Sequence, residues 1–168
     1  MEYIIIFIFL LILSAFFSGT ETAYFHIRKH RKETPEKIKS VLDYPQRLLV
    51  SLLTGNTIVN VSIASLAAYI TAGFADDYTW SKSTLILMEV LVVSVVVLIF
   101  GEILPKMIAI KYSKEYALKM YTPLKIMMFI LSPIAQGFNA ITNVVIKIIP
   151  FRKEKIFDSE EEIGRAHV

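Results

Sequence analysis

The chain has 168 residues, of which 55% are hydrophobic and 20% are charged, and its mean hydropathy is +0.56. This composition fits a membrane protein better than a soluble domain. Cysteine is absent, which excludes disulfides and thiolate metal sites. The net charge of +3 is concentrated in loops and gives no indication of a nucleic acid partner.

Three apolar segments are long enough to cross a lipid bilayer, at residues 3–25, 48–74 and 85–110. Each exceeds the roughly 20 residues that a hydrocarbon core requires. The first segment could instead be a secretory signal. However, Glu2 and no basic residue precede its apolar block, and no A-x-A-like cleavage site follows it. The sequence therefore predicts an all-α membrane protein with three transmembrane helices.

Basic residues are distributed unequally between the loops. Residues 28–47 include seven Lys and Arg against three acidic residues, whereas residues 75–83 include two Asp and one Lys. Further lysines follow the third span, at 111, 114, 119 and 125. The positive-inside rule then places the N-terminus outside and the C-terminus in the cytoplasm. We expect a multi-pass protein of the plasma membrane with this orientation.

The next apolar segment, 120–149, has polar residues three or four positions apart, which form one stripe along a helix. They are Ser132, Gln136, Asn139, Asn143 and Lys147. An amphipathic juxtamembrane helix over about 114–149, lying in the cytoplasmic interface, satisfies both this stripe and the charge rule. The alternative is a fourth span whose stripe faces the bundle. Pro123 and Pro133 are expected to break this segment near its start.

These assignments predict two regions, a transmembrane domain at 1–150 and the start of a cytoplasmic region at 151–168. Residues 158–162 form a Ser-x-x-Glu capping box with an acidic first turn, which predicts that a helix begins there. We expect a soluble domain to continue beyond Val168.

Within the spans, Ser18 lies ten residues before Arg28, Asn56 nine residues after Arg47 and Glu102 nine residues before Lys111, counted to the basic residues that mark the cytoplasmic ends. At 1.5 Å per residue this is a depth of about 14 Å, near the middle of a core about 30 Å thick. A carboxylate at this depth is costly and usually faces a partner, a pore or an ion. Each of the three residues also adjoins a glycine. Together with Pro105, this pattern predicts a third helix that is broken around a cation.

Hydroxyl, amide, carboxylate and main-chain carbonyl oxygens suit hard cations such as Mg²⁺, Ca²⁺ or Na⁺. Ser14 and Asn60 lie one turn from Ser18 and Asn56 on the same helix faces. Each could equally serve only in helix packing. Lys106, one turn after Glu102, could neutralise that carboxylate or extend to the cytoplasm.

Two further acidic residues lie in the spans. Glu21 could attract a cation or form a structural bond with Thr22 or the nearby backbone. Glu89 could line an external ion path, although a hydrated acid near a helix end is the simpler interpretation. Asp76 and Asp77 fit a turn. The sequence has no Ser/His/Asp set, phosphate loop or metalloprotease helix, so we do not expect an enzyme.

Three motifs occur in order, one on each span: LSAFFSGTETA at 13–23, LTGNTIVN at 53–60 and GEILPK at 101–106. They resemble the transmembrane domain of the CorC/cyclin M (CNNM) magnesium transporters, and the resemblance covers essentially the whole chain. One departure is Thr20. A common form of the first motif is Ser-Gly-Ser-Glu, and Thr20 stands in place of its second serine.

The resemblance implies a homodimer of three-helix protomers with a cytoplasmic juxtamembrane helix, and magnesium export coupled to sodium. It also implies a Mg²⁺ site at the membrane centre, at Ser14, Ser18, Asn56, Gly101 and Glu102, with Asn60 as a weaker candidate. Family members usually continue into paired CBS domains that bind adenine nucleotides such as ATP, which would lie outside this chain. The alternatives are a magnesium-sensing or scaffold subunit that regulates another transporter, and a proton-coupled carrier.

Overall fold

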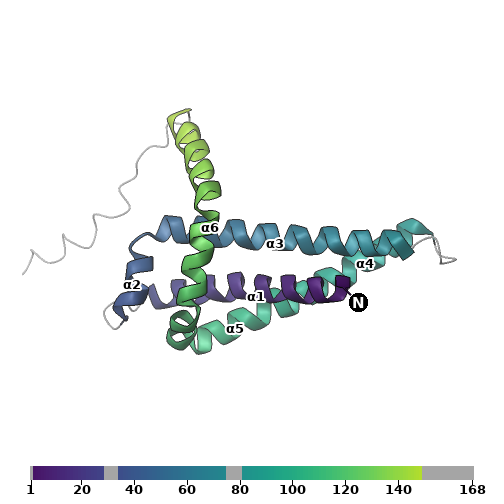
Figure 1. Ribbon diagram of the computed structural model, residues 1–168, viewed down its shortest axis with the longest axis horizontal. Coiled ribbons are helices and arrows are strands. Elements are labelled where there is room, and N and C mark those ends of the chain that lie inside the picture. Colours follow the sequence, from purple (N-terminus) through teal and green to yellow (C-terminus); the bar gives the residue numbers. More distant parts are fainter. Residues whose placement is uncertain (1, 29–33, 75–80, 149–168) are drawn as a thin grey trace, which may run out of the picture. The chain divides into compact units, whose positions relative to one another are not determined.

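The computed structural model describes residues 2–28, 34–74 and 81–148, and every regular element in these ranges is a helix (Figure 1). The all-α prediction is therefore confirmed for this part of the chain. In order, the elements are α1 (Glu2–Arg28), α2 (Glu36–Leu42), α3 (Pro45–Phe74), α4 (Lys82–Val96), the π-helix η3 (Val97–Ile103), α5 (Leu104–Lys111) and α6 (Ser113–Ile148).

Three helical segments are long and apolar enough to cross a membrane: Glu2–Arg28, Pro45–Gly73 and Ser83–Lys111. The last of these runs without interruption through α4, η3 and α5. All three agree with the predicted spans, because hydropathy over about 20 residues is a strong signal. Helix α6 is not one of these three segments, and its position in the cytoplasmic interface stays a prediction.

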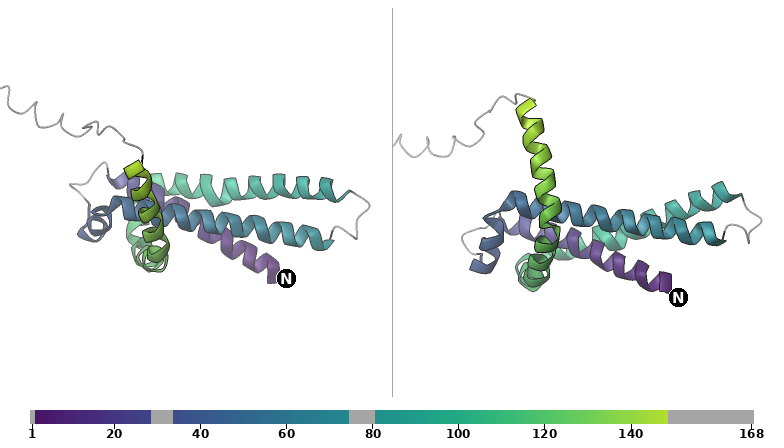
Figure 2. Two further views of the ribbon diagram at one scale, coloured as in Figure 1. Left: turned by 90° about the horizontal axis from the view of Figure 1, so that it is seen from above. Right: turned by 45° about the horizontal axis from the view of Figure 1, so that its top comes forward.

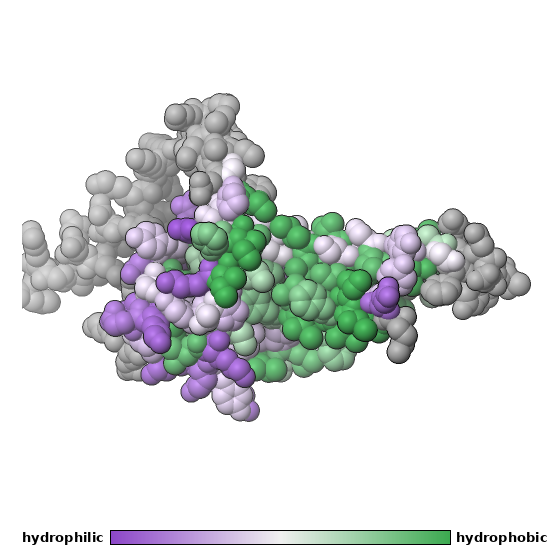
Figure 3. All heavy atoms as spheres, viewed as in Figure 1, coloured by the Kyte–Doolittle hydropathy of each residue, from purple (hydrophilic) through white to green (hydrophobic). Residues whose placement is uncertain are grey.

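Residues 1–135 form one compact unit, in which α1 packs along α3 and against η3 and α5, while α3 also packs against α4 (Figure 2). Successive spans run in opposite directions. Over most of their length their large apolar side chains are exposed, and hydrophilic residues gather around α2 and the start of α6 (Figure 3). An apolar exterior with polar residues at one end is what a lipid environment requires.

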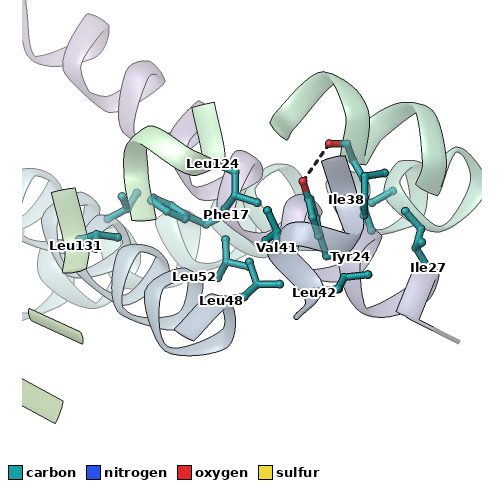
Figure 4. Packing of buried hydrophobic residues seen from close by; sticks show 14 of the residues in the cluster. Phe17, Tyr24, Ile27, Ile38, Val41, Leu42, Leu48, Leu52, Leu124 and Leu131 are labelled. Atoms are coloured by element: carbon teal, nitrogen blue, oxygen red, sulfur yellow. Dashed lines mark hydrogen bonds between the residues drawn. The ribbon is translucent and has the colours of Figure 1, made fainter. Parts of the chain in front are cut away.

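The buried core lies mainly at the end of the bundle that includes α2 (Figure 4). The sequence predicts a basic loop at residues 28–47, and α2 within it is a difference from that prediction. Ile38, Val41 and Leu42 recur at helical spacing and are buried against α1 and α3. The available signal was Pro35 followed by an acidic first turn, a common helix start.

Helix α6 continues through Pro123 and Pro133, so the expected break near its start is wrong. In the part that belongs to the first unit, Ala117, Leu124 and Leu131 are buried seven residues apart and hold one face against the core. This burial offsets the roughly 3 kcal/mol that an interior proline costs. From Gln136 on, α6 belongs to a second unit. Apart from Ser132, the side chains of the predicted polar stripe lie outside the described residues, as do the Asp76–Asp77 turn and the 158–162 capping box.

Two tyrosines connect α6 to α1. Tyr24 Oη donates a buried hydrogen bond to the carbonyl oxygen of Ala117 at 3.2 Å, drawn as the dashed line in Figure 4. Tyr116 packs so closely on Gly19 that any side chain added there would overlap its ring. The first turns of α6 are therefore fixed to the C-terminal half of α1.

Replacing Tyr116 with Phe should reduce the sensitivity of the fold to alkaline pH. Burial raises the pKa of the Tyr116 hydroxyl, an effect that the nearby Thr20 hydroxyl partly opposes. Because this pKa is raised in the folded state, the contribution of the Tyr116 hydroxyl to the free energy of unfolding is fully present below the pKa of the unfolded chain, about 10. That contribution is lost as the pH rises through the pKa of the folded state. Thermal unfolding in detergent between about pH 8 and 11 should show a shallower decline for the variant. Tyr112→Phe, at a half-exposed position, is the control, and parallel curves for Tyr116→Phe and wild type would contradict the expectation.

Candidate metal-binding site

Ser14 is completely buried where α1, α3 and η3 meet. Its hydroxyl donates to Asn60 Oδ1 at 2.9 Å, and Asn56 Oδ1 is a more distant acceptor at 3.4 Å. Gly101 of η3 also lies against it, because a Cβ built at Gly101 would be 2.8 Å from Ser14 Oγ. The structure thus brings four of the six predicted residues together, and we call them the Ser14 cluster: Ser14, Asn56, Asn60 and Gly101. Ser14, which the sequence could not distinguish from a packing residue, is the one that contacts the other three.

The predicted role of glycine in close helix approach also holds between α1 and α3. Gly55 is buried, and a Cβ there would overlap the ring of Phe17. Absence of a side chain lets the two backbones approach at the level of Ser14 and Asn56.

Ser18 lies one turn further along α1 and is 1% exposed. Its hydroxyl oxygen has no hydrogen-bond partner in the part of the chain that the structure describes. Its main-chain carbonyl accepts a hydrogen bond from Thr22 Oγ1 at 3.1 Å. An unpaired buried hydroxyl costs about 1–3 kcal/mol, and a bound cation would offset this cost.

The third span is not broken at Glu102, so that expectation is wrong. It winds instead as the π-helix η3, in which the Leu104 N–H donates to the carbonyl of Ile99, five residues earlier. Such turns are rare and occur often at functional sites. Because Pro105 has no N–H, one main-chain carbonyl of this segment also loses its helical donor. This segment therefore has a main-chain carbonyl without a helical N–H donor, although the span is continuous.

Glu102 lines a cavity of about 360 Å³ together with Asn60 and Ser94, and the rest of the lining is apolar. Within the described residues its carboxylate forms no hydrogen bond or ion pair. Lys106 is not its partner, so the interpretation of Lys106 as a neutralising residue is wrong. Glu102 therefore remains an unpaired acid at the level of the Ser14 cluster.

Lys106 lines a second cavity, between the last turns of α1 and α5, together with Glu21, Thr22 and His26. This cavity lies next to the cluster, on the side of the basic helix ends at Arg28 and Lys111. Because Glu21 lines this cavity, its position fits an acid that attracts a cation better than one that forms a structural bond with Thr22. The hydroxyl of Thr22 bonds to Ser18 instead.

Glu89 lies apart from these residues, in α4. The side chain is half-buried, and its Oε2 atom is buried without a hydrogen-bond partner among the described residues. This environment does not fit a hydrated acid at a helix end.

The described residues include no group of three or more His, Cys, Asp or Glu that could hold a metal. A cation in the Ser14 cluster would therefore be bound by neutral oxygens and by Glu102 as the single charge. Such a set favours hard cations and gives little affinity for zinc or copper.

Replacing Ser14 with Ala should destabilise the bundle by about 0.5–2 kcal/mol, because it removes the hydrogen bond to Asn60 between two spans. Denaturant unfolding in detergent micelles measures this change. Ser62→Ala is the matched control, since the Ser62 hydroxyl bonds only to the carbonyl of Ile58 in its own helix. Equal stability of the two variants would show that the contact between α1 and α3 contributes nothing.

Three spans around a buried cluster of oxygens define a multi-pass membrane domain. Residues 5–166 match the family model described as the cyclin M transmembrane N-terminal domain (CNNM), so the chain belongs to this family. The resemblance seen in the three motifs is thereby confirmed.

Similar proteins occur in bacteria and plants. The chain is 28% identical to the UPF0053 inner membrane protein YfjD of Escherichia coli over 90% of its own length, and 27% identical to a UPF0053 protein of Haemophilus influenzae over 94%. A chloroplastic DUF21 domain-containing protein of Arabidopsis thaliana is 25% identical over 92% of the chain. The chain spans 36%, 39% and 24% of the length of these three relatives, respectively.

Proposed function

We propose that this chain is the membrane domain of a magnesium transporter, which binds Mg²⁺ at the Ser14 cluster and exports it in exchange for Na⁺. The observation that supports this most directly is the combination of a buried, unpartnered Ser18 hydroxyl with an unpaired Glu102 carboxylate beside the Ser14–Asn60 contact. The buried hydroxyl of Ser51 likewise has no hydrogen-bond partner among the described residues. It is therefore the position of the Ser18 hydroxyl, one turn from Ser14 on α1, that supports a cation site.

The chemistry of the cluster favours Mg²⁺ because this ion gives up its water reluctantly and needs several oxygens in return. Ser14, Ser18, Asn56, Asn60 and a main-chain carbonyl near Gly101 supply neutral oxygens. Glu102 supplies the charge that offsets part of the lost hydration.

The two cavities suggest how the ion moves. One adjoins Glu102 and Asn60, and the other adjoins Glu21 and Lys106 one to two turns away. We propose that alternating access opens the cluster to one side at a time, with the basic helix ends in the cytoplasm and the N-terminus outside. Such a domain needs no catalytic residues and is not an enzyme.

Two further features of the whole protein belong to this proposal. Two copies pair through apolar surfaces of the spans, which are extensively exposed in the single chain. Helix α6 lies in the cytoplasmic interface and leads to CBS domains that bind adenine nucleotides and regulate transport.

The test is Mg²⁺ flux in proteoliposomes that contain the purified chain, measured with and without a sodium gradient. We expect flux that is accelerated by an opposing sodium gradient. Flux that follows a pH gradient and ignores sodium would favour the proton-coupled carrier. Stabilisation by Mg²⁺ without any flux would favour the sensing or scaffold subunit, in which the Ser14–Asn60 bond would be structural.

A further inference from the structure

A third cavity, of about 360 Å³, lies among α2, the start of α3 and the first unit's part of α6, away from the Ser14 cluster. Its described lining comprises Ser40, Val41, Tyr44, Arg47, Lys125, Met128 and Phe129. Two of these side chains are cations and none is acidic. The cavity therefore has the electrostatic character of an anion site.

Both cations are held in position by neighbouring side chains. Arg47 Nη2 donates to Ser132 Oγ at 3.2 Å, which connects α3 to α6. The ammonium of Lys125 lies 5.3 Å from the centre of the Tyr121 ring. Lys125 is also the first cause of a lowered pKa of the Tyr121 hydroxyl, followed by Ser40, as expected in an electropositive environment.

The other half of the cavity is apolar and opens outward. Val41 is buried at its base, whereas Phe129 is 80% exposed at its edge. Lys125, Met128, Phe129 and Ser132 share one face of α6, because they recur at intervals of three and four residues. A molecule in this cavity would meet cations at one end and an unpartnered aromatic side chain at the other.

The place of the cavity along the spans fits such an amphipathic molecule. Arg47 lies in the first turn of the second span, at the same end of the bundle as the basic helix ends Arg28 and Lys111. Phospholipid phosphates occupy this depth, and their acyl chains begin just below it.

We propose that this cavity binds the phosphate of an anionic phospholipid between Arg47 and Lys125, with an acyl chain against Met128 and Phe129. The hydroxyl of Tyr44 would donate to a remaining phosphate oxygen, whereas that of Ser40 donates to the carbonyl of Lys37 at 2.7 Å. Bound in this way, one lipid molecule would join α2, α3 and α6. This site is independent of the proposed ion transport.

The test is a titration of the purified full chain in non-ionic detergent with a short-chain phosphatidylglycerol, with bound lipid counted by native mass spectrometry. We expect saturable binding that is at least about tenfold tighter than binding of the phosphatidylcholine with the same chains. Inorganic phosphate at the same concentration should not displace the lipid. Equal binding of the two lipids, or displacement by phosphate alone, would overturn the assignment of an anionic lipid.

Variants locate the site. Arg47→Gln combined with Lys125→Gln should weaken phosphatidylglycerol binding by about 30-fold, which corresponds to about 1 kcal/mol for each cation. The matched control removes two exposed cations of α6 outside the cavity, Lys114→Gln with Lys119→Gln. Equal losses in the two double variants would show general attraction to a basic surface and would overturn the site.

The apolar end has its own pair of variants. Phe129→Ser should weaken binding of both lipids, whereas Ile126→Ser, at another exposed position of α6, should not. Both side chains are exposed, so neither change is expected to unfold the helix, which circular dichroism verifies. Unchanged lipid binding by Phe129→Ser would overturn the assigned position of the acyl chain.

Discussion

Glu102→Gln is expected to abolish Mg²⁺ flux while the protein remains folded. Two unit charges 4 Å apart interact by about 4 kcal/mol at an effective dielectric constant of 20. Removal of the single carboxylate of the site should therefore weaken Mg²⁺ binding by at least about 100-fold. Because Glu102 has no hydrogen bond or ion pair in the described part of the chain, the amide leaves no partner unsatisfied.

Flux in proteoliposomes and the Mg²⁺-dependent increase in melting temperature should both be lost in this variant. Glu115→Gln is the matched control, because Glu115 is an exposed acid in the first turn of α6. Glu102→Asp retains the charge on a shorter side chain and should recover part of the binding. Wild-type flux through Glu102→Gln would refute the proposed site.

Hydropathy and residue type were sufficient to predict the spans and most of the residues that meet between them. Apolar length determines a transmembrane helix almost without regard to its neighbours. Small residues in a span likewise indicate close approach of helices. Hence Gly55 and Gly101, and Asn56 beside the first of them, could be assigned to helix contacts from the sequence.

The centre of the cluster could not be predicted because it depends on helix rotation. Counting 1.5 Å per residue placed Ser18 at the level of Asn56, whereas Ser14, one turn earlier on the same face, makes the contact. A count along the chain gives depth only for straight helices perpendicular to the membrane. It contains no information on the π-helical winding of η3, which changes both rise and rotation.

Helix α2 was missed for a different reason. Ten of the twenty residues at 28–47 are charged, which obscures the apolar spacing of α2. A helix of seven residues also has little stability of its own. It forms because Ile38 and Leu42 are buried against α1 and α3. Tertiary contacts of this kind cannot be predicted from the residues of the helix alone.

Gly101→Ala should destabilise the protein by about 1–3 kcal/mol, the usual cost of adding atoms to a packed interior. The added Cβ would lie 2.8 Å from Ser14 Oγ and 3.3 Å from Ser14 Cβ. If the hydroxyl rotates away, it loses its bond to Asn60, and if it stays, η3 must move from α1. In either case the oxygens of the cluster separate, so Mg²⁺-dependent stabilisation should also decrease.

Gly73→Ala is a control of opposite expected sign, because no atom lies within 4 Å of a Cβ at that position in α3. It should stabilise the helix by about 0.5–1 kcal/mol. Denaturant unfolding in micelles, with and without Mg²⁺, measures both variants. The double variant Ser14→Ala/Gly101→Ala then isolates the contact, because removal of the hydroxyl makes room for the new methyl group. The double variant should lose less free energy of unfolding than the two single variants lose together. Strict additivity would show that a residue other than Ser14 leaves no room for a side chain at position 101.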